Sequence, residues 1–291
     1  MVSRNRNNRS ATDSTWLLLA VSLVASLFVA SPPVAAQSSD SASRPLAINA
    51  RVTGSAASGT QQQNAVNLNL SAGNSSADDT KRGADATRGR FEFAYGNGKK
   101  PGQDRITTTE MFYGELVESV AITNGPLQKD AQGNDEQGRA PLWLQGVAST
   151  YHHIAFGLDH ERSFGIGLNY TAQSGFSASA DFRHVRQSFA AQSDLSAWGV
   201  GLRQTYTFQK GISPAPDRRV VAIGESIEVV PLFNTADPVK ARGLLSFTLP
   251  LVAGFTWETS FGIDYLSNAD PGSKDLYWKF NVGGIGYSFS R

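Results

Sequence analysis

The sequence predicts an all-β fold in the form of a single antiparallel transmembrane β-barrel of about twelve strands, with about ten as the alternative count. Three observations predict this fold. The chain begins with an export segment, most of it alternates in polarity with a period of two, and its last predicted strand ends in alternating aromatic residues. An even strand number is expected because a bacterial barrel starts and ends on the periplasmic side.

Residues 1–36 have the composition of a cleavable signal peptide. Arginines precede an uncharged apolar stretch at 16–30, and small residues up to Ala36 place the cleavage site before Gln37. The apolar stretch is shorter than the roughly 20 residues that a spanning helix needs, which disfavours the alternative of an uncleaved anchor. Nothing downstream approaches about 18 consecutive apolar residues. A mature chain that enters a membrane must therefore do so as a closed barrel.

The mature chain divides into a Ser-rich segment at 37–45, which we expect to be disordered, and one barrel domain at 46–291. A formal net charge of +1 and the lack of a long Lys or Arg run argue against a nucleic-acid partner. Cysteine is absent, which excludes disulfides, thiolate metal sites and Cys nucleophiles.

Alternation is clear in Val66, Leu68 and Leu70 against Asn67 and Asn69, and it recurs along the chain. One face of each such strand is apolar and the other is polar. The predicted strands are 46–53, 64–73, 90–97, 106–118, 142–150, 161–172, 175–187, 195–209, 219–233, 240–250, 254–266 and 275–289.

A soluble barrel or sandwich with its apolar face inward also gives such alternation. We favour the membrane reading because many strands are long, the polar face is rich in Gly, Ser, Thr and Asn, and aromatic residues lie toward the strand ends. The segments 106–118 and 219–233 alternate weakly, because Glu110, Glu115 and Glu225 interrupt either face. These two segments leave the strand count open.

The last strand contains Gly284, Tyr287 and Phe289, which resemble the C-terminal signal that the barrel-assembly machinery recognises. Two further residues follow Phe289, which departs from that signal. The apolar face also changes parity near Gly283 and Gly284, and a β-bulge there would reconcile the two halves. We therefore expect the assembly machinery and outer-membrane lipid as partners, and a monomeric barrel.

Two stretches resemble the YdiY-like family of salt-induced outer-membrane proteins, a domain of unknown function. The first is Phe-Gly-Leu-Asp at 156–159, running into Arg162, and the second is 265–275, leading to Gly-Tyr-Ser-Phe at 286–289. The resemblance covers about residues 46 to 291. It implies a barrel in the Gram-negative outer membrane, and it implies no catalytic residue because the family has no established activity.

Counting strands back from a periplasmic C-terminus places the loops at 151–160 and 267–274 outside and the turns at 173–174 and 251–253 inside. The long 121–141 segment then falls on the periplasmic side, as an insertion or as a sign of a miscounted strand. On the cleanest strands the charges of the lumen-facing parity are Arg51, Glu92, Asp181, Arg183, Arg203, Arg242, Glu258 and Asp264. Their signs balance, which predicts a mostly closed lumen in so narrow a barrel.

His152, His153, Asp159, His160 and Glu161 form the densest group of possible metal ligands. We favour a polar surface loop, because they lack the spacing of a metal site. No Gly-x-Ser-x-Gly nucleophile elbow occurs in a strand-turn-helix context. We expect a structural or envelope-stress-related barrel, with no enzyme activity, catalytic residue, metal or cofactor. The alternatives are a narrow pore, an outer-membrane lipid hydrolase and a soluble periplasmic binding protein.

Overall fold

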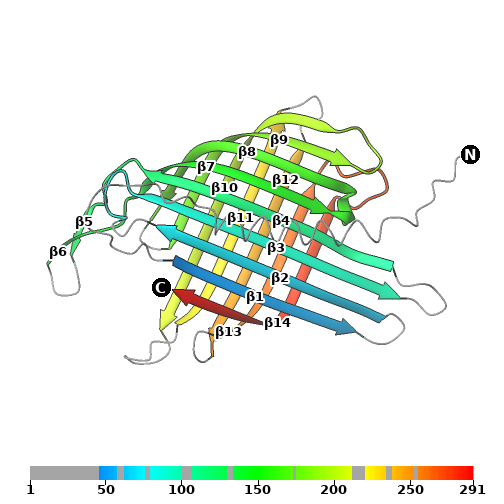
Figure 1. Ribbon diagram of the computed structural model, residues 1–291, viewed down its shortest axis with the longest axis horizontal. Helices are drawn as coiled ribbons and strands as arrows, with labels where there is room; N and C mark the ends of the chain where they lie inside the picture. The colour runs from blue at the N-terminus through cyan, green and yellow to red at the C-terminus, as the bar shows by residue number, and fades with distance from the viewer. Residues whose placement is uncertain are drawn as a thin grey trace, which may run out of the picture. The chain divides into compact units, whose positions relative to one another are not determined.

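Twelve antiparallel strands pair in sequence order and close into a barrel through the pairing of the first strand with the last (Figure 1). The computed structural model describes residues 46–57, 62–75, 79–99, 106–129, 134–172, 175–211, 220–233, 238–251 and 255–290. The signal peptide at 1–36 and the Ser-rich segment at 37–45 lie outside these ranges. No helix within them is long and apolar enough to cross a membrane.

The barrel strands are β1 (Leu46–Ala57), β2 (Gln62–Ser75), β3 (Asp85–Lys99), β4 (Ile106–Ala121), β7 (Leu142–His153), β8 (Leu158–Thr171), β9 (Phe176–Phe189), β10 (Leu195–Gly211), β11 (Val220–Phe233), β12 (Val239–Pro250), β13 (Phe255–Leu266) and β14 (Leu276–Ser290). Each matches one predicted strand. The predicted twelve strands are therefore confirmed.

The two weakly alternating segments are full barrel strands, β4 and β11. Glu110 and Glu115 lie an odd number of residues apart on β4, so they face opposite sides of the wall. Glu115 points into the barrel, where it contacts Arg203. Glu225 on β11 is exposed on the outer wall, where its Oε1 accepts a hydrogen bond of 3.3 Å from Gln204 Nε2. The glutamates that interrupt the alternation therefore lie on both faces of the barrel wall.

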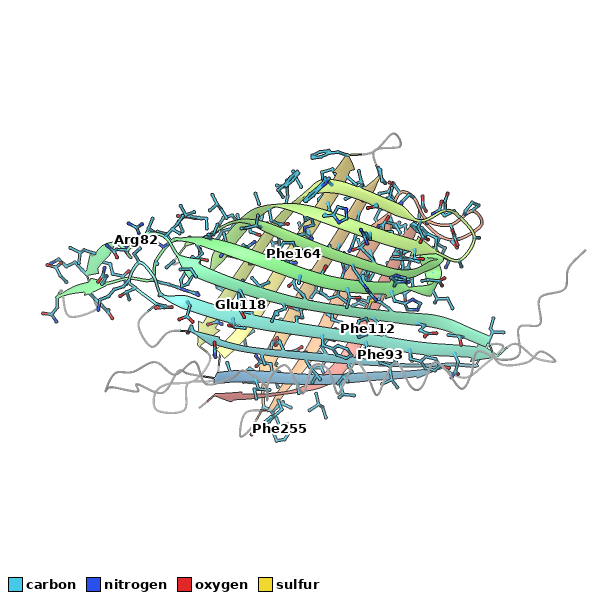
Figure 2. The ribbon with its side chains drawn as sticks, turned by 45° about the horizontal axis from the view of Figure 1, so that its top comes forward. Arg82, Phe93, Phe112, Glu118, Phe164 and Phe255 are labelled. Atoms are coloured by element: carbon cyan, nitrogen blue, oxygen red, sulfur yellow. The ribbon has the colours of Figure 1, made fainter. Side chains whose placement is uncertain are left out.

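The apolar face of the barrel wall points outward. Phe164, Trp278 and Ile285 have exposed fractions of 66%, 65% and 62%, although each lies within a strand. Phe255 likewise points away from the barrel (Figure 2). A soluble barrel would bury these side chains inside. The alternation found in the sequence therefore corresponds to an apolar exterior and a polar interior.

The predicted bulge near Gly283 and Gly284 is present in β14. Glu258 on β13 pairs with Gly284, and Ser260 pairs with Asn281, so β14 carries one extra residue between these pairs. The extra residue reverses the parity of the strand, which keeps apolar side chains on the outer wall on both sides of the bulge.

The termini of the barrel wall, where β1 begins at Leu46 and β14 ends at Ser290, lie at the same end of the barrel as the long connection between β4 and β7. This connection forms a small hairpin of β5 (Leu127–Lys129) and β6 (Asp135–Gln137), which projects beyond the barrel end (Figure 1). Its base is anchored to the wall, because Trp143 Nε1 donates a hydrogen bond of 2.7 Å to the Ala140 carbonyl. The segment is a long connection with its own hairpin, and no barrel strand was miscounted.

The opposite end is held together by three connections. The β7–β8 connection forms a short 3-10 helix, η1 (Ile154–Phe156). The Asp270 amide, between β13 and β14, donates to the Phe156 carbonyl at 2.9 Å. The Ala191 amide, between β9 and β10, donates to Asp270 Oδ2 at 2.7 Å. Asp270 thus links all three connections.

Gly157 is the residue that lets these connections meet. It has a φ of +66°, and a Cβ at this position would overlap the side chain of Asp270. Gly272 also has a positive φ, of +84°, but a Cβ there would meet nothing within 4 Å. We expect Gly272→Ala to lower the free energy of unfolding by about 1 kcal/mol from backbone strain alone. Gly157→Ala should lower it by about 3 kcal/mol because overlap adds to that strain.

Urea unfolding of the folded barrel, followed by tryptophan fluorescence, measures both variants. Equal losses for the two substitutions would contradict the assigned role of Asp270.

Candidate functional site in the barrel lumen

Charged side chains from most of the strands gather inside the barrel, which makes the lumen the candidate functional site. The structure places seven of the predicted lumen charges on the inner wall: Glu92, Asp181, Arg183, Arg203, Arg242, Glu258 and Asp264. The side chain of Arg51 lies outside the described part of the structure. On a strand that contributes, the charged side chain belongs to the alternate residues that point into the barrel.

The first ion-pair cluster joins β4, β9, β10 and β11. Arg183 donates to Asp181 on its own strand, with Nε to Oδ1 at 2.5 Å and Nη2 to Oδ2 at 2.7 Å. Glu228 accepts from Arg183 at 3.0 Å and from Arg203 at 3.1 Å. Arg203 Nη1 also donates to Glu115 Oε1 at 2.9 Å. The planar guanidinium groups thus bridge carboxylates on separate strands.

The second cluster lies beside the first and joins β3, β12, β13 and β14. Arg242 Nε donates to Asp264 Oδ1 at 2.9 Å, and its Nη2 donates to Glu92 Oε2 at 3.0 Å. Lys279 Nζ lies 3.7 Å from Glu92 and 3.8 Å from Asp264. The Arg242 guanidinium also lies over the ring of Tyr113, 4.1 Å from its centroid. The hydrogen bond from Arg242 on β12 to Glu92 on β3 spans the interior, because these strands are not neighbours in the barrel.

The third contact lies closer to the end opposite the termini. Lys240 on β12 forms an ion pair with Glu161 on β8. Gln187 Nε2 donates to the other oxygen of Glu161 at 2.8 Å, and Asn268 Nδ2 donates to Gln187 Oε1 at 2.8 Å. Lys240 also lies 4.6 Å from the ring centroid of Tyr151. The charge pair is therefore enclosed by hydrogen bonds and an aromatic ring.

An apolar cluster fills the interior beyond these charges. It consists of Ala94, Met111, Tyr113, Tyr151, Phe156, Leu158, Phe189 and Leu266. The His153 ring packs against this cluster, 4.5 Å from the Phe156 ring and 4.6 Å from the Tyr277 ring between centroids. Because Phe156 comes from η1, the connection between β7 and β8 closes this end of the barrel from inside.

The space left between the side chains is small. One cavity of about 30 Å³ is lined by Glu92, Tyr113, Arg203, Glu228 and Arg242, which belong to the first two clusters. Such a volume holds on the order of one water molecule. The arrangement can hold water and fixed charges, but at this place it offers no room for a substrate.

Several lumen charges were missed from the sequence, among them Arg90, Glu115, Glu161, Glu228, Lys240 and Lys279. Glu115 and Glu228 lie on the two weakly alternating strands, where the sequence does not say which parity faces inward. Glu161 was assigned to a surface loop. The signal that could have found Lys240 is parity, because it lies two residues from Arg242 on β12.

The possible metal ligands near 152–161 point in different directions. His152 is on the outer wall, with Nε2 3.9 Å from Glu110, whereas His153 is buried inside and its Nδ1 accepts a hydrogen bond from the Ala155 amide. Glu161 is buried against Lys240, which corrects its placement in a surface loop. Within the described ranges no group of three or more His, Asp or Glu side chains is arranged to hold a metal ion.

The proposed assembly signal lies on the strand that closes the barrel. Gly284 follows the bulge and faces inward, and Tyr287 is exposed on the outer wall with its ring 5.0 Å from that of Phe255. The backbone of Phe289 pairs with Ile48 of β1, and its side chain lies outside the described part.

Comparisons with known proteins find likeness in solved structures. No protein-family model matches the sequence, and no curated protein matches it. The β domain of the Bordetella autotransporter BrkA is 13% identical, with a TM-score of 0.37 over 84% of this chain and 99% of that chain. The translocator domain of the autotransporter NalP from Neisseria meningitidis is 11% identical, with a TM-score of 0.38 over 95% and 98%.

An outer-membrane channel from Pseudomonas putida F1 is 9% identical, with a TM-score of 0.40 over 89% of this chain and 99% of that chain. At these TM-scores the likeness says nothing of what this chain binds or transports.

Glu228 tests whether the paired charges hold the interior together. We expect Glu228→Gln to lower the free energy of unfolding by about 3 kcal/mol, because it leaves Arg183 and Arg203 short of a buried counter-charge. The matched control is Glu225→Gln on the same strand, which removes an exposed charge on the outer wall and should change stability by less than about 1 kcal/mol. Urea unfolding in detergent micelles compares the two variants. A smaller loss for Glu228→Gln than for Glu225→Gln would contradict the pairing.

Proposed function

We propose that this protein is an outer-membrane β-barrel with a closed lumen, and that its role in the envelope is structural. The observation that carries the proposal is the division of the wall into an apolar outer face and an inner face of paired charges. Exposed apolar side chains such as Phe164, Leu202, Ile227, Leu245 and Trp278 lie on strands around the barrel. Lipid is the environment in which such a surface is stable.

Ion pairs between strands on different sides of the barrel support a closed lumen. Arg203 reaches from β10 to β4, Arg242 from β12 to β3, and Lys240 from β12 to β8. Each of these contacts crosses the space that an aqueous channel would occupy. The apolar cluster around Phe156 blocks the same path farther along. An open pore would have to break several of these contacts together.

Other parts of the proposal come from the sequence. Four of these parts stay predictions: membership of the YdiY-like family, export behind a signal peptide at 1–36, recognition by the barrel-assembly machinery, and a monomeric state. If β14 ends on the periplasmic side, the start of β1 and the β5–β6 hairpin also face the periplasm, and Gly157 faces the outside of the cell.

Heat-modifiability tests the membrane barrel. The unboiled protein from the outer-membrane fraction should migrate differently from the boiled protein on an SDS gel, because a closed antiparallel barrel resists SDS until heated. Recovery of the protein in the soluble periplasmic fraction, with a single migration before and after boiling, would contradict the proposal.

Conductance in a planar bilayer tests the closed lumen. We expect no large, stable conductance steps from the purified barrel. The double substitution Arg203→Ala and Arg242→Ala removes two side chains that cross the lumen but leaves the apolar cluster around Phe156 in place, so this variant should also show no large, stable steps. Urea unfolding and heat-modifiability verify that this variant is folded. Large stable steps from the parent protein would overturn the closed-lumen proposal.

A further inference from the structure

Two arginines lie side by side on the outer wall, near the end of the barrel opposite the termini. Arg162 on β8 and Arg186 on β9 are direct partners across the strand ladder, and both side chains are exposed. The same row continues to Thr150 on β7 and to Ser196 on β10. The row is therefore a polar strip across four adjacent strands, with the two positive charges at its centre.

The next row toward the middle of the barrel is aromatic. It contains Phe164, which is 66% exposed, followed by His184 and Trp198. The Trp198 ring stacks on that of Phe182 at 4.9 Å between centroids. Rings of this kind mark the boundary between hydrocarbon and headgroups in membrane barrels. The two arginines lie one row beyond this boundary, where phosphorylated headgroups begin.

The guanidinium groups of the pair have no ion-pair partner within the described part of the chain. Within the described ranges the side chains of Arg162 and Arg186 have neither a hydrogen bond nor an ion pair, in contrast to the arginines of the lumen. Of the nearby carboxylates, Glu161 faces inward to Lys240, and Asp194 accepts a hydrogen bond from Ser188.

Like charges directly opposite each other in a ladder destabilise it, and their Cβ atoms lie about 5 Å apart. A counter-charge from outside the chain would remove this repulsion.

We propose that Arg162 and Arg186 bind the phosphate group of a glycolipid in the outer leaflet of the membrane. The inference rests on the proposed outer-membrane location. Guanidinium groups bind phosphate through paired N–H donors, and two of them on adjacent strands can hold one phosphate between them. Ser196 and His184 supply further polar atoms beside the pair, while Phe164 and Trp198 contact the acyl chains of the same lipid.

A lipid fits this surface better than free phosphate. The pair is exposed on a flat wall, and exposed ionic contacts with a small anion contribute little. A lipid adds the burial of acyl chains against the aromatic row directly below, so one ligand satisfies both rows. The binding surface is the combination of a basic row and an apolar row.

The test uses the purified, detergent-folded mature protein and bisphosphorylated lipid A as the probe, measured by native mass spectrometry. We expect the double substitution Arg162→Gln and Arg186→Gln to weaken binding at least tenfold. The matched control is Lys210→Gln, which removes an exposed outer-wall cation at the opposite end of the barrel and should leave binding unchanged. Fully dephosphorylated lipid A should bind the parent protein as weakly as bisphosphorylated lipid A binds the double variant.

Three results would overturn the inference: equal binding by the parent and the double variant, equal losses in the double variant and the control, or displacement of lipid A by an equal concentration of inorganic phosphate. The last result would identify a site for a free anion. Heat-modifiability of each variant verifies its fold. Fractionation of cells reports separately on the outer-membrane location, so failure of that proposal is distinguishable from failure of the lipid site.

Discussion

Pairing between opposite charges across the barrel is the interaction on which the closed interior depends. Arg203 shares its guanidinium between Glu115 on β4 and Glu228 on β11, so one side chain ties together strands that are far apart in the wall. A charge enclosed without a partner costs several kcal/mol. The interior therefore tolerates its many ionised groups only while they remain in contact.

The two ends of the barrel are built differently. Hydrogen bonds through Asp270 and the packing of Phe156 hold the end opposite the termini, so its connections form one unit with the interior. At the other end, Trp143 packs with small residues such as Ala121 and Ala140, and the β5–β6 hairpin extends away from this contact. The hairpin is a separate two-stranded sheet, so it adds no strand to the barrel wall.

The outer wall combines the two surfaces that a membrane requires. Apolar side chains occupy the middle of the strands, and polar side chains such as Arg162 and Arg186 begin one row beyond the aromatic ring of Phe164. The bulge in β14 serves this surface directly, because without it either Trp278 or Tyr287 would turn into the lumen. Strand register, more than composition, keeps each side chain on its proper face.

The sequence by itself determined the strand positions and the two faces of most strands, because side chains alternate along any extended chain and the apolar parity can be read locally. It also predicted the bulge near Gly284 from the change of parity. It did not determine the faces of β4 and β11, where Glu110 and Glu225 share the outer wall with apolar residues. Only the tertiary structure decided that Glu228 meets Arg183 and Arg203, that Lys240 meets Glu161, and that Arg162 lies beside Arg186. These contacts depend on strand register and on which strands face each other across a closed barrel, and both are set by the whole ring of strands rather than by any one segment.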